Sequence, residues 1–111
     1  MGAESFFKSV DKCGTPEARQ SAFDKLVEEA YYDYGHAGYT GKICEKSDFI
    51  YIPINIDVNV NVLEHHLYES NFELLFGENA KQAEDIYCDK WGPALCFDTN
   101  DATVFCGLAS A

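Results

Sequence analysis

The residues best suited to chemistry lie between Gly35 and Gly41, a glycine-rich segment that contains His36 and Tyr39. Three glycines in these seven residues permit the positive φ angles and close backbone contacts that a binding loop needs. Asp33 precedes His36 closely enough to orient its imidazole as a general base, which predicts a small-ligand site or an enzyme here. A histidine just after a helix is also favoured by the helix dipole, so a structural role for His36 stays open.

Two other groups of polar residues resemble parts of metal sites. Residues 57–61 begin like a calcium loop, but Val62 stands where the turn glycine is needed and Tyr68 where the last glutamate ligand is needed. The adjacent His65 and His66 would point about 100° apart on a helix and cannot bind one metal ion together. We therefore expect no metal and no cofactor.

Cysteine usage and motif content argue against a catalytic or secreted protein. The five cysteines form no Cys-x-x-Cys pair, and their odd number favours reduced, buried thiols over a disulfide framework. No nucleophile elbow and no phosphate-binding loop is present. The N-terminal residues lack the basic and apolar regions of a secretory signal. We expect a cytoplasmic protein that is not an enzyme and has no membrane span.

The charge of the chain is its strongest compositional feature. Nineteen acidic residues against eight basic ones give a formal net charge of −11, and residues 47–111 hold eleven of the acids with only Lys81 and Lys90. Such a field repels nucleic acid and anionic membranes and attracts a basic groove on a partner. An acidic surface also keeps small proteins soluble, so both interpretations stay open.

Aromatic residues offer a second signal for protein recognition. Tyr32 and Tyr39 belong to a group of tyrosines interleaved with acidic residues, and tyrosine supplies contact area at small entropic cost. The same composition is typical of a helix end packed on a sheet. Trp91 stands at a Gly-Pro corner, where it can anchor a partner or close the end of the core. We favour the core position for Trp91.

The elements that must position these residues follow from periodicity and capping. Residues 50–62 carry β-branched side chains at every second position, which predicts a strand with one apolar and one polar face over residues 48–56. Thr15 and Pro16 form a helix start, and an amphipathic helix is predicted to about residue 33. The other predicted elements are strands at 5–10 and 42–45, helices at 62–76 and 80–87, and a closing hairpin of strands 93–98 and 102–109.

These elements predict one α+β domain over residues 1–111. Its core would be an antiparallel sheet of about 4–5 strands, with the N-terminal amphipathic helix and one or two further helices packed on it. Short connections and an alternating central strand both favour antiparallel pairing, because a central parallel strand is apolar on both faces.

Two stretches resemble a known group of proteins. YYDYGHAGYTGKICEK at residues 31–46 and DKWGPALC at residues 89–96, with the ending at 105–110, are similar to small uncharacterised proteins carried by bacteriophages and prophages. The resemblance implies a protein that acts in bacterial cytoplasm. Small acidic phage proteins often inhibit host defence, as anti-CRISPR proteins and DNA mimics do, and this class-level association implies no particular activity.

The leading functional hypothesis is an acidic inhibitor that blocks a basic host protein or a nucleoprotein complex without binding nucleic acid or membrane itself. The residues expected to make contact are Asp57, Glu64, Glu69, Glu73, Glu84 and Asp85, with Tyr32 and Tyr39. One alternative is a ligand-binding or catalytic loop at residues 35–41. The other is a self-assembling homodimer, in which the alternating strand pairs with a second copy across an open sheet edge.

Overall fold

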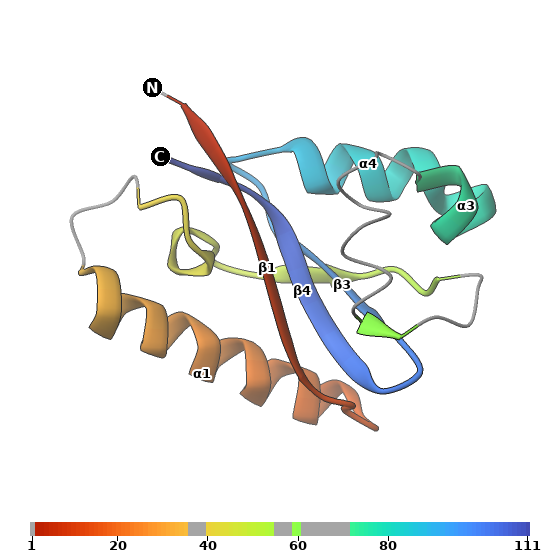
Figure 1. Ribbon diagram of the computed structural model, residues 1–111, viewed down its shortest axis with the longest axis horizontal. Helices are drawn as coiled ribbons and strands as arrows, with labels where there is room; N and C mark the ends of the chain where they lie inside the picture. Colours follow the sequence, from red (N-terminus) through yellow and green to blue (C-terminus); the bar gives the residue numbers. More distant parts are fainter. Residues whose placement is uncertain (1, 36–39, 55–58, 61–71) are drawn as a thin grey trace.

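The computed structural model describes residues 2–35, 40–54, 59–60 and 72–111. Its described elements are, in order, β1 (Ala3–Asp11), α1 (Pro16–Tyr34), η1 (Ile43–Glu45), β2 (Phe49–Tyr51), α3 (Phe72–Phe76), η2 (Gly77–Asn79), α4 (Ala80–Cys88), β3 (Ala94–Asp98) and β4 (Ala102–Ser110). The described strands form one four-stranded sheet in the order β1-β4-β3-β2, with α1 on one face and α3 and α4 on the other (Figure 1). The predicted α+β class is confirmed.

Local signals determine both ends of α1. The Thr15 hydroxyl accepts the Ala18 backbone N–H at 3.1 Å, and Pro16 occupies the first helical position. At the other end Gly35 adopts φ +84°, a conformation that favours glycine, and its N–H reaches the Tyr31 carbonyl at 2.8 Å. The helix predicted from Thr15 is therefore confirmed, with its end within a residue of the expected position.

Antiparallel pairing dominates the sheet, as expected. β1 pairs with β4 along its whole length, from Ala3 opposite Ser110 to Asp11 opposite Ala102. β3 and β4 form the predicted C-terminal hairpin, in which the Thr99 N–H donates to the Ala102 carbonyl at 2.8 Å. These two pairings place the ends of the described chain side by side, as Figure 1 shows.

The central strand predicted at 48–56 differs most from the structure. Within the described part of that range only β2 (Phe49–Tyr51) forms a strand, which lies at the sheet edge and runs parallel to β3. The parallel direction follows from the connection, because the chain passes through α3 and α4 before it returns as β3. The strand predicted at 42–45 is instead the 3₁₀ helix η1, where the Glu45 carboxylate accepts the Thr40 hydroxyl at 2.7 Å. Part of the helix predicted at 62–76 lies outside the described residues.

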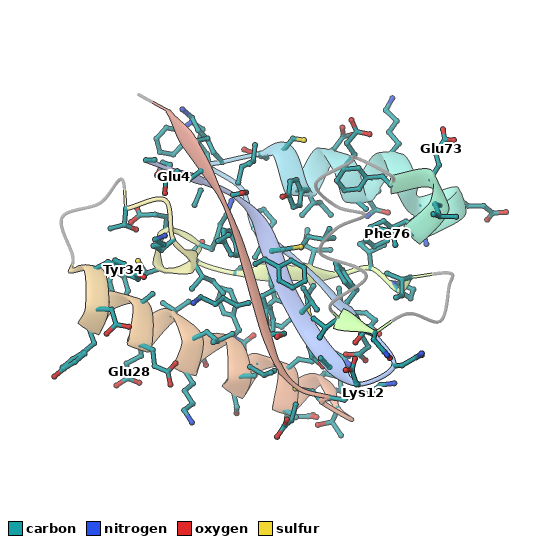
Figure 2. All side chains as sticks on the ribbon, viewed as in Figure 1. Glu4, Lys12, Glu28, Tyr34, Glu73 and Phe76 are labelled. Carbon is teal, nitrogen blue, oxygen red and sulfur yellow. The ribbon has the colours of Figure 1, made fainter. Side chains whose placement is uncertain are left out.

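Helices on both faces give the sheet two apolar layers. On the α1 side Phe105 contacts Phe23 and Phe49, with ring centres 5.6 and 5.2 Å apart. On the other side Phe76 of α3 meets Phe97, with ring centres 5.4 Å apart, and Figure 2 shows Phe76 between its helix and the sheet. Because each central strand is covered twice, β3 and β4 consist almost entirely of buried residues.

This double layer also changes the predicted apolar and polar faces of the central strand. Ile50, expected on the apolar face, is 39% exposed at the sheet edge. Tyr51, expected on the polar face, packs against the cluster beneath α1. The prediction is correct further along, where Ile52 is buried and Pro53 exposed.

The five thiols are free and occupy different environments. Cys44, Cys96 and Cys106 are buried, Cys13 is half-buried and Cys88 is exposed. The expectation of buried thiols is thus correct for three of them and wrong for Cys88. Burial, followed by the charge of Asp98, raises the pKa of Cys96 to about 12, and burial raises the pKa of Cys106 well above its usual value.

We therefore expect stability to fall in alkali. Above pH 9 the unfolded chain releases the protons of Cys96 and Cys106 while the folded chain keeps them, so the unfolded state binds fewer protons and the free energy of unfolding decreases. At pH 10 this loss should be about 1.4 kcal/mol for each thiol, roughly 2–3 kcal/mol together, relative to pH 7. Urea unfolding at each pH measures the effect. A Cys96→Ala/Cys106→Ala variant should show a shallower decline, and an equal decline in both proteins would contradict this assignment.

Candidate protein-binding surfaces

The turn between α4 and β3 presents the single tryptophan on the surface. Trp91 is 63% exposed, and the Lys90 amine lies 5.2 Å from the centre of its indole ring. The Asp89 carboxylate accepts the Trp91 backbone N–H at 3.0 Å, and the Asp89 carbonyl accepts the Gly92 N–H at 3.2 Å. The interpretation that Trp91 closes the core is wrong. An exposed aromatic residue on a fixed turn is typical of a contact residue in a protein interface.

Lys46 supports this turn from inside the molecule. Its side chain is only 3% exposed, and its ammonium group donates to the carbonyls of Asp89 and Gly92 at 2.9 and 3.0 Å. Burial lowers the pKa of Lys46, and the charge of Asp89 partly opposes that shift. Gly92 is close-packed as well, because a Cβ there would lie 2.6 Å from the Asp89 carboxylate. The backbone beneath Trp91 is thus held at several points.

The carboxylates of α4 lie near the end of the helix that leads into this turn. Glu84 and Asp85 are exposed, and after burial they are the next causes of the raised pKa of Cys88, so they lie near that thiol at the end of the helix. Asp89 follows directly. We call Glu84, Asp85, Asp89 and Trp91 the α4 acidic surface. It joins two of the predicted contact residues to an aromatic residue that sequence reasoning placed in the core.

Glu73, a third predicted contact residue, lies on α3. It is exposed, and Figure 2 shows its side chain pointing away from the body of the protein. The neighbouring Leu74 is 51% exposed. α3 packs against the same face of the sheet as α4, so Glu73 lies on the same side of the sheet as Glu84 and Asp85.

Tyr32 occupies a different part of the molecule. It is 92% exposed on α1, where Lys25, Glu28, Glu29 and Asp33 surround it in a shallow surface hollow. Figure 2 shows Glu28 on the side of α1 that faces away from the sheet. Because α1 and α4 cover opposite faces, Tyr32 cannot share one contact surface with the α4 carboxylates. We call these five residues the α1 acidic face.

The other predicted site residues lie outside the described part of the chain. They are Asp57, Glu64, Glu69 and Tyr39, together with His36, His65 and His66. The ligand-binding or catalytic loop at residues 35–41 therefore stays a prediction. Within the described ranges, no group of three or more His, Cys, Asp or Glu side chains is arranged to hold a metal ion.

Comparisons with known proteins indicate no function for this chain. No protein-family model matches the chain, and searches of curated proteins and of solved structures find no match either. Among the described helices, none has the length and apolar character needed to cross a membrane.

Proposed function

We propose that this chain is a non-enzymatic phage-type inhibitor that acts in bacterial cytoplasm. Its α4 acidic surface would occupy a basic groove on a host protein or nucleoprotein complex that handles nucleic acid, and so block that groove. The observation that carries the proposal is the 63% exposed Trp91, held by the buried Lys46 on the turn that follows α4, the helix that carries Glu84 and Asp85.

Net charge would act on the partner before contact, and individual side chains would act after contact. The net charge of −11 accelerates the encounter with a basic partner and orients it before contact. Carboxylates on one helix can then meet the Lys and Arg side chains that normally bind phosphates. Carboxylate contacts alone are weak when exposed, so a desolvated aromatic anchor is needed for stable binding. Trp91 supplies that anchor.

Affinity capture with the tagged full-length chain tests this function. Bacterial lysate is passed over the immobilised protein and washed at about 50 mM and about 500 mM salt, where screening differs strongly. We expect a nucleic-acid-binding protein at low salt that is lost at high salt and released by heparin, a polyanion that competes for basic grooves. Retention of an acidic protein that neither salt nor heparin displaces would contradict the proposal.

The α1 acidic face is the second candidate surface for the same partner. Tyr32 supplies an exposed aromatic side chain there, and Glu28, Glu29 and Asp33 supply the negative charge. The described residues that line its hollow all belong to one helix. A fixed turn such as that under Trp91 loses less entropy on binding, which favours the α4 acidic surface.

A further inference from the structure

The outer edge of β1 is open in the described part of the chain. β1 is the first strand of the sheet and pairs only with β4. Gly2 and Ala111 exchange both backbone hydrogen bonds, at 3.3 and 3.2 Å. Because antiparallel pairs alternate, the even-numbered residues of β1 bond to β4, and the N–H and C=O groups of Ala3, Ser5, Phe7 and Ser9 point to the free side.

A groove runs beside this edge, between β1 and α1. Two adjoining hollows form it, the larger about 310 Å³ in volume. Val10, Ala22 and Leu26 give it an apolar floor. The charged residues along it are Lys8, Lys25, Lys42, Asp11, Glu29 and Asp33. These charges balance, whereas the whole chain carries a net charge of −11.

We propose that a second copy of this chain docks on this edge, with the two β1 strands paired antiparallel. The charged residues described along the groove are three acids and three lysines, so it can pair with a copy of itself without an excess of like charge. A basic partner suited to the α4 acidic surface would meet three lysines here. A nine-residue strand with unpaired backbone groups on one side is also a ready template for another strand.

Charge pairing selects one register. A two-fold axis through Phe6 places Glu4 opposite the partner subunit's Lys8, and the reverse, on the face that carries α1. It also sets Ser5 opposite the partner's Phe7, so that about eight backbone hydrogen bonds form across the interface.

The neighbouring registers fit less well. An axis through Phe7 leaves both charges opposite apolar residues, and an axis through Lys8 puts two ammonium groups opposite each other. The axis through Phe6 also leaves Asp11 outside the paired region, where its carbonyl already accepts the Cys13 thiol at 3.6 Å.

Sedimentation of the full-length chain at about 150 mM salt tests the pairing, since exposed charges are then screened beyond about 8 Å. We expect a reversible monomer–dimer equilibrium. Ser9→Pro removes an N–H that faces only the free edge, so the monomer should fold normally while dimerisation weakens by at least about tenfold. Ser9→Ala is the matched control and should dimerise like the natural chain.

A charge swap tests the register. Lys8→Glu should weaken dimerisation because it sets two acids opposite each other, and Glu4→Lys/Lys8→Glu should restore it. Circular dichroism confirms that each variant is folded. The proposal is overturned if the natural chain stays monomeric at about 1 mM, if Ser9→Pro dimerises normally, or if the double swap fails to restore pairing. Glu84 and Asp85 lie on α4, which packs on the other face of the sheet, so Glu84→Lys/Asp85→Lys should leave the dimer intact and separates this proposal from the inhibitor proposal.

Discussion

Replacing Lys46 with alanine is expected to lower the free energy of unfolding by about 3–4 kcal/mol, because the Asp89 and Gly92 carbonyls lose the ammonium donor and the buried side chain leaves a cavity. The two bonds, to Asp89 and Gly92 at 2.9 and 3.0 Å, connect segments more than 40 residues apart. For a chain of this length the loss corresponds to roughly 10–20 °C in melting temperature. Thermal unfolding followed by circular dichroism measures it.

Two controls separate hydrogen bonding from packing. Lys46→Met keeps most of the side-chain volume but cannot donate, so it should recover only the cavity contribution. Lys81→Ala on the exposed side of α4 should change stability by less than about 0.5 kcal/mol. If Lys46→Met were as stable as the natural protein, the ammonium group would not brace the Trp91 turn.

Trp91→Ala is expected to weaken partner binding by about 30- to 1,000-fold, the effect of removing a central aromatic anchor worth 2–4 kcal/mol. Stability should change by less than about 1 kcal/mol, because most of the side chain is already in solvent. Binding of the captured partner to immobilised variants gives the dissociation constants.

Leu74→Ala provides the matched control for Trp91→Ala. Leu74 is another large, exposed apolar side chain, with 51% of its surface accessible. It lies on α3 and not on the turn that carries Trp91. Its removal should alter affinity by less than about threefold. Equal losses for the two variants would show that general apolar contact, and not the Trp91 corner, determines binding.

The parts of the fold that sequence predicted well are those that depend on nearby residues. The Thr15 cap and Gly35 stop lie within or next to α1, and the β3–β4 hairpin closes through a short turn at Thr99. The direction and position of β2 depend instead on a helical crossover of more than 40 residues, which no local pattern encodes. The helices that cover both faces of the sheet are also placed by such long-range connections. Their positions explain why Ile50 and Tyr51 exchange their expected environments.

In the candidate site, too, the features set by nearby residues were predicted and those set by long-range contacts were not. A polar helix face predicted that Glu84, Asp85 and Tyr32 would be exposed, and they are. Their separation onto opposite faces of the sheet required the three-dimensional arrangement. The turn that carries Trp91 is held by Lys46, whose partners lie 43 and 46 residues further along the chain. A lysine buried by so distant a segment leaves no pattern in the sequence.

Charge reversal on opposite faces of the sheet tests the central claim most directly. Glu84→Lys/Asp85→Lys and Glu28→Lys/Glu29→Lys change the net charge equally, so any general electrostatic effect on capture is matched between them. The two variants and the natural chain are used to capture partner from the same bacterial lysate at low salt. We predict that the α4 variant loses the nucleic-acid-binding partner while the α1 variant retains most of it. Loss with the α1 variant alone, or full capture by both, would contradict binding through the α4 acidic surface.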